Sequence, residues 1–424
     1  MLSRHTARTA LTSLALAALA LSTAACTSSP EPPPPAEPVS VALPLNGIPT
    51  EPINVGLLVP PLEGEGSEYR PLVEGAGIAV YRFNLAGGKI QLVTALDDGT
   101  TAGATSAMEE LLSAEVAGVV MAAGGPHTDQ ALQAASSAGT AVIMAYHQPV
   151  QPLEGVWSLA PSTTALAAGV GAALEKAGSN RPLLITVPDK TNTLGFTPAK
   201  TVTTAQLQTL GQTTVASFED RSVDAVVVDA PAVEQGLVVA AIQEQLGARQ
   251  LPMILTPAAL TPAFSNQLVR AGTPAGWLMS VGTDCGDYTA LAQGEQADNT
   301  AAFLNAVRLA AGDAGCWNVY GDDVCAASAL QADIASHDAT VALLRAVGLA
   351  GSANPVQVRA YLATLQTTTT DGLAGPALDF TQPAVLNDDA VVVLYASTTD
   401  PGLRPAMIPN RASGQLFWFA NPGK

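Results

Sequence analysis

Few stretches of this sequence combine residue types that could catalyse a reaction. Gly64-Glu65-Gly66 follows an apolar run and matches the first half of a dinucleotide-binding loop, but the third glycine of that pattern is missing. Glu63 and Glu68, with Glu65, would also place negative charge beside a pyrophosphate. The chain has no G-x-S-x-G, H-E-x-x-H or Walker A sequence and only four histidines. We therefore expect a protein that is not an enzyme and that carries no cofactor.

The cysteines are candidates for a disulfide rather than for a metal site. The four are Cys26, Cys285, Cys316 and Cys325, and their spacing fits no zinc pattern. Cys316 and Cys325 flank the segment WNVYGDDV, which we interpret as a surface excursion, so this pair is the first candidate for a disulfide. Pairing of Cys285 with either of them is an open alternative.

The elements that must position any site begin at Ile53. Val55–Val59 is an apolar run short enough for a strand that is buried on both faces. A Gly- and Glu-rich loop follows, and Pro71 then opens a helix that ends at Gly87-Gly88. The strand Lys89–Thr94 completes a βαβ unit. Its first loop lies at the carboxyl end of a strand, where open parallel sheets bind ligands.

The alternation of strands and helices continues and then restarts after a short crossing at Val156–Ala160. We therefore predict an α/β fold of two doubly wound, Rossmann-like lobes, followed by a mainly helical region. The further elements predicted for the first block are Thr101–Glu115, Gly118–Ala122, a helix ending at Ala138, and Thr140–Met144; those for the second are Thr163–Lys176, Leu183–Val187, a helix at Thr201–Leu210, Ala225–Asp229, Ala232–Leu246, Met253–Thr256 and Pro262–Ala271.

Composition and charge narrow the class of protein. The 424 residues are enough for two or three domains. Hydrophobic residues make up 48% of the chain and charged residues only 13%, which indicates folded cores rather than disorder. The net charge of −18 would repel phosphate backbones, so we expect no nucleic-acid partner.

The N-terminus has the features of a bacterial export signal. Arg4 and Arg8 precede the apolar run Ala10–Leu21, and residues 22–26 (STAAC) resemble a lipobox, in which Cys26 would be lipidated after cleavage. An ordinary signal peptide with an incidental cysteine is the alternative. Residues 27–52 are rich in Pro, Ser and Glu and are expected to form a tether. The expected location is the outer face of the cell membrane, through a lipid anchor.

Four passages in a fixed order carry a resemblance to a known family. They are VGLLVPPLEG…VEGAGIAVYRFNLAGGKIQLVTALDDG, Val119–Ala145, Leu159–Ser162, and the pair Ser336–Ala339 with Gly375–Phe380. Together they make the chain similar to the type I periplasmic binding proteins of the branched-chain amino-acid class, which serve ABC importers. Residues 282–325 are the least similar part.

The resemblance implies two lobes joined by a three-strand hinge and closing over a small solute. Lobe I would comprise residues 53–160, continued by about 282–370, and lobe II residues 161–281, continued by about 371–424. The partners it implies are the solute and the permease subunits of an ABC importer, for a monomeric chain. A sensory or interaction lipoprotein on the same fold is the alternative function.

In the family, the loop before the third helix holds the ligand carboxylate with backbone N–H groups and hydroxyls. The matching loop here is Gly124–Thr128, in which Gly125 and His127 replace the usual hydroxyl residues and Thr128 remains. His127 is either a ligand contact or a solvent-facing loop residue. Thr128 either donates to the ligand or caps its helix.

Four further residues complete the expected site. Tyr146 and His147 follow the fourth strand and would form an aromatic wall, unless Tyr146 only packs on the hinge. Tyr69 matches an aromatic residue at the mouth of the family's cleft. On the second lobe, Glu234 aligns with the acid that neutralises a bound ammonium, and the alternative is a first-turn glutamate that stabilises its helix dipole.

Overall fold

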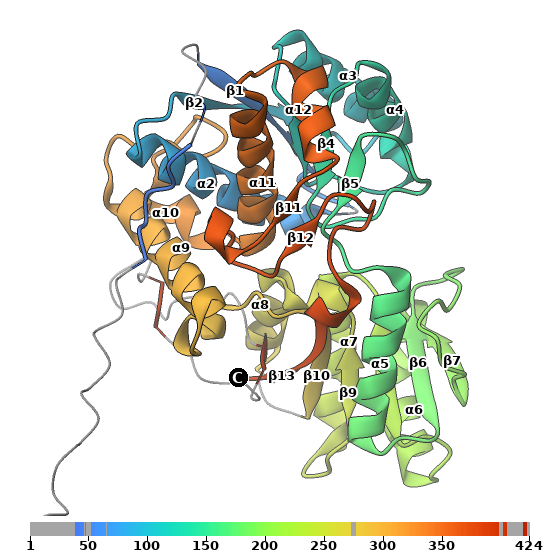
Figure 1. Ribbon diagram of the computed structural model, residues 1–424. Helices are drawn as coiled ribbons and strands as arrows, with labels where there is room; N and C mark the ends of the chain where they lie inside the picture. The colour runs from blue at the N-terminus through green and yellow to red at the C-terminus, as the bar shows by residue number, and fades with distance from the viewer. Residues whose placement is uncertain are drawn as a thin grey trace, which may run out of the picture. The chain divides into compact units, whose positions relative to one another are not determined.

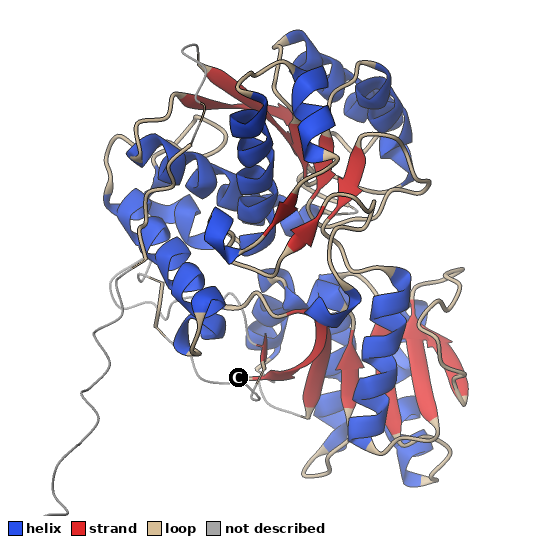
Figure 2. Cartoon of the chain, viewed as in Figure 1, coloured by secondary structure: helices blue, strands red, loops and turns tan. Residues whose placement is uncertain are grey.

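The computed structural model describes residues 39–45, 47, 52–64, 66–272, 277–397, 402–404 and 419–421. The expected signal peptide, Cys26 and the first part of the tether lie outside these residues. The described chain forms two α/β lobes, each built on its own sheet, and the predicted fold class is confirmed (Figures 1 and 2). In the part of the chain that is described, no helix has the length and apolar character needed to cross a membrane.

The first sheet contains five parallel strands in the order β2-β1-β3-β4-β5. The interior strand β1 is buried because its sequence, INVGLLV, is largely apolar on both faces. Val55 pairs with Leu92 on one side, and Leu57 pairs with Val120 on the other. The strands are β1 (Ile53–Val59), β2 (Ile90–Leu96), β3 (Val119–Met121), β4 (Val142–Met144) and β5 (Val156–Ser158).

Helices cover both faces of this sheet. Val55 and Leu57 point into a core with α2 (Glu74–Leu85) and α11 (Ile334–Ala350). Leu58 points the other way, into a core with α3 (Thr101–Ser113) and α4 (Asp129–Ser137). In Figure 1, α11 and α12 (Pro355–Leu362) lie against elements from the beginning of the chain. The first lobe is therefore assembled from distant parts of the sequence.

The second sheet repeats the topology of the first. Its order is β14-β13-β10-β9-β8-β6-β7, and β6 to β10 are parallel, whereas β13 and β14 are antiparallel to their neighbours. One face is covered by α5 (Thr163–Ala177), and the other by α6 (Leu207–Glu219), α7 (Ala232–Leu246) and α8 (Pro262–Ala271). The strands are β6 (Pro182–Thr186), β7 (Lys200–Thr203), β8 (Ala225–Asp229), β9 (Met253–Leu255), β10 (Leu278–Thr283), β13 (Val391–Ala396) and β14 (Phe419–Ala420).

One element of the second lobe differs from its prediction. The helix expected at Thr201–Leu210 is a strand at its start, because Thr201, Val202 and Thr203 belong to β7 and pair with β6. The helix α6 begins only at Leu207. Three β-branched residues in a row favour a strand when a neighbouring edge is available for pairing.

The crossings between the lobes can be located from the strands that precede them. The first crossing follows β5 and the second follows β10. The third comes later than the boundary of about 371, because Leu373, Phe380 and Leu386 are still buried in the core of the first lobe. This stretch contains β11 (Gln366–Thr367) and β12 (Leu378–Asp379), and the chain re-enters the second sheet at β13. Ser158 donates its N–H to Pro383, so the first and third crossings run side by side.

Residues after the third crossing return to the first lobe. Arg404 forms a bidentate ion pair with Asp287, with N–O distances of 2.8 and 2.9 Å. The Nη1 group of Arg404 also donates to the carbonyls of Leu330 and Ala332. These contacts hold residues 402–404 beside α9 (Glu295–Gly312), α10 (Cys325–Ser328) and the 3-10 turn Ala329–Gln331. This return adds to the three crossings that the resemblance implied.

The described part of the expected tether is folded against the first lobe. Leu43 and Leu45 are 6% and 5% exposed and belong to the core that contains β1. The N–H of Leu43 donates to the carbonyl of Arg82, and Arg82 Nε donates to the carbonyl of Val41 at 2.8 Å. The prediction that all of residues 27–52 form a linker is therefore wrong for residues 39–45. Their alternating apolar residues have a surface on which to pack.

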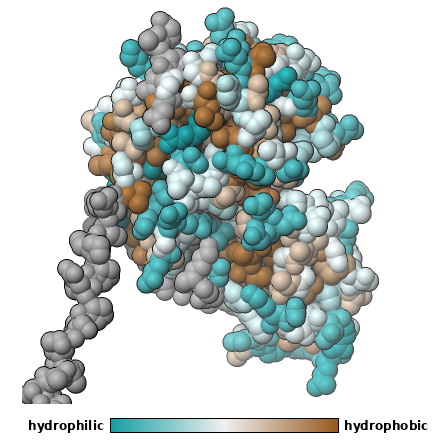
Figure 3. All heavy atoms as spheres, in the orientation of Figure 1, coloured by the Kyte–Doolittle hydropathy of each residue, from teal (hydrophilic) through white to brown (hydrophobic). Residues whose placement is uncertain are grey.

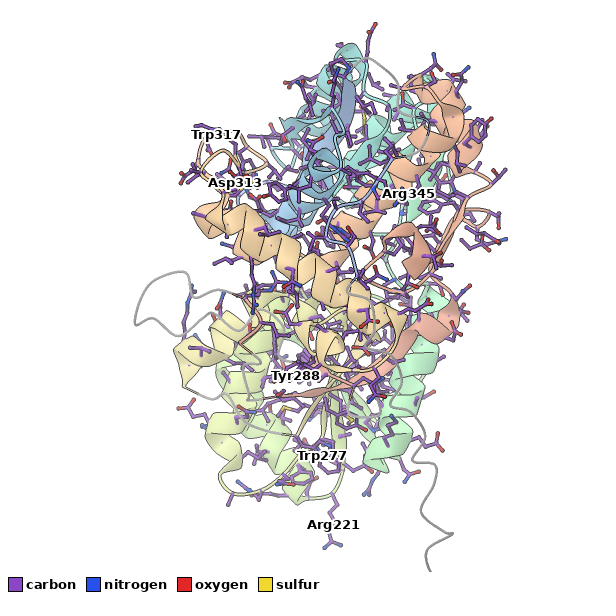
Figure 4. All side chains as sticks on the ribbon, turned by 60° about the vertical axis from the view of Figure 1, so that its left-hand side comes forward. Arg221, Trp277, Tyr288, Asp313, Trp317 and Arg345 are labelled. Atoms are coloured by element: carbon purple, nitrogen blue, oxygen red, sulfur yellow. A yellow bond between two sulfur atoms is a disulfide. The ribbon has the colours of Figure 1, made fainter. Side chains whose placement is uncertain are left out.

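Cys316 and Cys325 form a disulfide, with their Cα atoms 5.3 Å apart, and Cys285 is a free cysteine. The disulfide closes a loop that contacts β2, the outer strand of the first sheet, through a hydrogen bond from Thr94 Oγ1 to the carbonyl of Val319. Figure 4 shows Trp317 near Asp313 at the end of α9. On the face drawn in Figure 3, hydrophobic residues form small groups between hydrophilic ones.

A buried polar network connects the segments of the first lobe. Arg82 Nη1 lies 2.9 Å from His337 Nε2, and His337 Nδ1 lies 2.6 Å from Asp338 Oδ1. Because a guanidinium can only donate, Nε2 accepts and the Nδ1–H group donates to Asp338. Burial lowers the pKa of His337, so this imidazole is neutral. The Asp338 carboxylate also accepts the N–H groups of Ala374 and Gly375.

Replacing Asp338 with Ala should destabilise the protein strongly. The change leaves one imidazole and two backbone donors unpaired in a buried site, and breaking a buried charged network costs roughly 3–5 kcal/mol. Urea denaturation of D338A against wild type measures this loss. The matched control is D389A at an exposed position, which should stay within about 0.5 kcal/mol of wild type. Equal losses in both variants would contradict the role of the network.

Candidate functional site

A cleft lies at the carboxyl ends of the central strands of both sheets. In each lobe the strand order reverses beside the first strand, between β1 and β3 and between β6 and β8. Such a switch point leaves a crevice at which open α/β sheets bind ligands. The loops after these strands line one cleft of about 1200 Å³. Its polar lining includes Ser67, Glu68, Tyr69, Tyr146 and His147 from the first lobe and Lys190, Asp229, Glu234, Asn266 and Arg270 from the second.

Three aromatic rings form the wall of the cleft on the first lobe. Tyr69 and Tyr146 are stacked, with ring centroids 4.5 Å apart and planes 14° apart, and His147 meets Tyr69 edge-on at 5.1 Å. Burial raises the pKa of both tyrosines, with a further contribution from the charge of Asp333, so both hydroxyls stay protonated. The Tyr146 hydroxyl donates to Asp333, so the wall can stack on a solute and offer it the Tyr69 hydroxyl as a hydrogen-bond donor. Tyr146 also packs against the core of the first lobe.

The imidazole of His147 covers the loop that was expected to bind a carboxylate. A Cβ atom on Gly124 would lie 2.2 Å from His147 Cγ, so only glycine leaves room for the ring. Burial, together with a smaller contribution from the charge of His127, lowers the pKa of His147 to about 4, so the ring is neutral. Its buried Nε2 atom has no hydrogen-bond partner among the described residues. A buried, neutral and unpartnered nitrogen beside a cleft is suited to a hydrogen bond with a solute or water.

The other residues of that loop lie away from the lining of the cleft. His127 Nε2 is 2.7 Å from Asp97 Oδ2, and the Thr128 hydroxyl donates to the carbonyl of Gly125 at 2.8 Å. Gly125 has a φ of 105°, a conformation that favours glycine, and precedes the 3-10 turn before α4. The polar groups of His127 and Thr128 are therefore used within the first lobe, and the cleft lining contains none of these three residues.

Charged residues form the wall of the cleft on the second lobe. Lys190 Nζ and Asp229 Oδ1 are 2.8 Å apart, which joins the loops that follow β6 and β8. Glu234 lies in the first turn of α7, and its Oε2 atom is buried without a hydrogen-bond partner among the described residues. This position suits both interpretations, since a first-turn carboxylate stabilises the helix dipole and can also accept a hydrogen bond from a cation.

Asp333 was not expected from the sequence, although it connects the aromatic wall to α11. It caps this helix by accepting the N–H of Ser336, and its Oδ1 accepts the Tyr146 hydroxyl at 2.9 Å. Burial raises the pKa of Asp333 to about 6, while hydrogen bonds from Ser336 and Tyr146 and the charge of Arg404 act in the opposite direction. Asp333 directly precedes the apolar run that forms α11, and an aspartate in that position is a sequence signal of a helix cap.

Replacing Asp333 with Asn should change how stability depends on pH. Because the pKa of this carboxyl is raised from 3.8 to about 6, the folded state keeps a proton that the unfolded state releases between these values. The stabilisation by this proton is present at low pH and lost as the pH rises through about 6. The unfolding free energy of D333N minus that of wild type should therefore rise by up to about 3 kcal/mol between pH 4 and pH 8.

Urea denaturation at the two pH values measures this gain. The exposed substitution D389N, which should follow wild type at both values, is the control. If the difference in unfolding free energy between D333N and wild type does not change with pH, the raised pKa of Asp333 is contradicted.

Replacing Gly124 with Ala should disturb the aromatic wall. The new methyl group would overlap the His147 ring, and overpacking of this kind costs roughly 1–3 kcal/mol. The matched control is G171A on α5, where no atom lies within 4 Å of the added carbon and a small gain is expected. Thermal unfolding of both variants tests the contact, and a G124A variant as stable as G171A would disprove it.

Comparisons of structure identify the fold. No protein-family model matches the chain, and no curated protein matches it in sequence. A periplasmic binding protein type 1 from Bordetella pertussis Tohama I is 17% identical, with a TM-score of 0.61 over 83% of this chain and 98% of that one. The branched-chain amino acid transporter substrate binding protein LivJ from Streptococcus pneumoniae, in complex with isoleucine, is 18% identical, with a TM-score of 0.59 over 81% and 100%.

A solute binding protein of an ABC transporter from R. palustris, in complex with 4-hydroxybenzoate, also matches. It is 14% identical, with a TM-score of 0.61 over 82% of this chain and 94% of that one. At these identities the comparisons establish the fold. The chain has the fold of the type 1 periplasmic binding proteins, and the resemblance seen in the sequence is confirmed at this level.

Proposed function

We propose that the protein is an extracytoplasmic solute-binding lipoprotein that captures a small polar solute and delivers it to an ABC importer. The solute is an amino acid or a related amide or peptide-like molecule. The observation that carries this proposal is the cleft of about 1200 Å³ that both lobes line at their switch points. A solute that touches both walls stabilises the closed arrangement of the lobes, which a permease can then recognise.

The fold likeness supports the same proposal, because the matching proteins include those bound to isoleucine and to 4-hydroxybenzoate. In this proposal Tyr69, Tyr146, His147 and Glu234 contact the solute. Gly125, His127 and Thr128 support the first-lobe wall from behind. Cys26 carries the lipid anchor and the protein acts as a monomer on the outer face of the cell membrane.

Replacing Glu234 with Gln should weaken the binding of a solute that carries an ammonium group. A thermal-shift screen of amino acids, amides, urea and short peptides first identifies a solute by the rise in unfolding midpoint. Calorimetry then compares wild type, E234Q and the matched control E244Q, which changes an exposed position on the same helix. Loss of a charge-assisted hydrogen bond should lower the affinity of E234Q roughly tenfold, with E244Q unchanged.

An E234Q variant with wild-type affinity would remove Glu234 from the site. A wild-type protein whose midpoint rises with none of the solutes would count against import altogether.

The alternative is a ligand-sensing or interaction lipoprotein that has no role in transport. The position of His147 over Gly124 favours it, since the loop that receives a carboxylate in the family is altered here. Uptake assays separate the two functions. Deletion of the protein abolishes uptake of its solute if it serves an importer, and leaves uptake unchanged if it is a sensor.

A further inference from the structure

A second cavity, called the hinge cavity here, lies between the lobes behind the two tyrosines. Its walls come from both lobes and from the crossings: Leu159 to Pro161 on the first crossing, and Thr283, Cys285 and Gly286 on the second. Most of the side chains facing it are apolar. They are Leu72, Leu159 and Ile334 from the first lobe and Leu260, Leu394 and Phe419 from the second.

The size of the hinge cavity suits one compact apolar group. Its volume is about 110 Å³. Dry apolar cavities of the same order, about 150 Å³, accept a benzene molecule. The polar groups at its wall are few: the hydroxyl of Thr261 already donates to the carbonyl of Ala258, and Asp333 accepts the Tyr146 hydroxyl. The hinge cavity can therefore take a branched aliphatic group or a ring, with polar atoms only at its edge.

The hinge cavity and the cleft are adjacent. Tyr69, Tyr146, Ala160, Pro161 and Pro257 line both of them, so the tyrosine stack is their common wall. A solute whose polar end lies in the cleft, beside Glu234, can place its apolar end in the hinge cavity. Such a molecule would contact both lobes and the crossings at once.

The charges around the two spaces disfavour an anion. The wall of the hinge cavity includes one carboxyl group, that of Asp333, and no lysine or arginine among the described residues. In the cleft, Asp229 already pairs with Lys190, whereas the buried Glu234 Oε2 has no partner among the described residues. The loop Gly124–Thr128 is covered by the neutral ring of His147. Arg270 lines the cleft as an exposed cation at the end of α8.

We propose that the hinge cavity receives the apolar part of the solute, and that this solute is a neutral or cationic molecule with one compact apolar group. The inference rests on the proposed function and gives it a substrate class. The inference predicts that the protein discriminates between solutes in two respects. It should reject a solute whose only charged group is a carboxylate, and it should reject a solute whose apolar group does not fit the hinge cavity.

Four probes with matched groups test the class by calorimetry on the purified full-length chain. L-leucinamide, L-leucine and 4-methylpentanoate share an isobutyl group and differ in charge, as a cation, a zwitterion and an anion. Glycinamide carries the same head group as leucinamide without the apolar part. Leucinamide should bind most tightly, with glycinamide weaker by about tenfold to a hundredfold, as expected for burial of a leucine-sized group. Tighter binding of 4-methylpentanoate than of leucinamide would overturn the inference.

Two variants test the hinge cavity itself. Ala335 lines it from the first turn of α11, and A335L should fill it and lower the affinity for leucinamide about tenfold or more, without changing that for glycinamide. The matched control is A102L, which adds the same atoms at an exposed position of α3. Should A335L prove unfolded by circular dichroism, L260A from the second lobe replaces it. That variant enlarges the hinge cavity and should shift the preference from leucinamide to phenylalaninamide.

The outcomes separate this inference from the proposed function. The assignment of the hinge cavity is rejected if leucinamide binds wild type and A335L equally well, or if L260A keeps the wild-type preference. The proposed solute-binding function is unaffected by either result. A wild-type chain that binds none of these probes and none of the screened solutes overturns both.

Discussion

The first lobe depends on a buried carboxylate that collects donors from distant parts of the chain. Asp338 accepts hydrogen bonds from His337 and from the backbone N–H groups of Ala374 and Gly375, while His337 accepts from Arg82, 255 residues away in the sequence. None of these groups reaches water, so each depends on the others for its hydrogen bonds. The network therefore fixes α11 against α2 and holds the segment after β11 beside them.

Fixing α11 also positions the site. The N-terminus of this helix places Asp333, which accepts the Tyr146 hydroxyl, and Tyr146 in turn stacks on Tyr69. The aromatic wall is thus connected to the core by side chains that are themselves held by packing and hydrogen bonds. A wall supported in this way keeps its shape before a solute arrives, which limits the loss of conformational entropy on binding.

Local patterns were sufficient for much of the fold and for part of the site. The helices Ala232–Leu246 and Pro262–Ala271 were predicted with their observed bounds, because proline and glycine mark their ends. Thr201–Thr203 was misassigned because pairing with β6 decides its structure, and such pairing is not a local property. For the same reason Asp333 and Lys190 were missed: their partners, Tyr146 and Asp229, are 187 and 39 residues away.

In the proposed function, the two walls of the cleft disfavour a negatively charged solute by different physical means. On the first lobe, burial keeps His147 uncharged, so its ring presents a neutral surface over Gly124. On the second lobe, Lys190 is paired with Asp229, and the buried Glu234 Oε2 atom has no hydrogen-bond partner among the described residues, while Arg270 is an exposed cation at the edge of the cleft. An anion would have to break that pair or lie beside an unpaired carboxylate, whereas an ammonium or an amide gains a hydrogen bond in either case. In the proposed function, both lobes therefore disfavour a negatively charged solute, and loss of water from the cleft on binding would strengthen this preference.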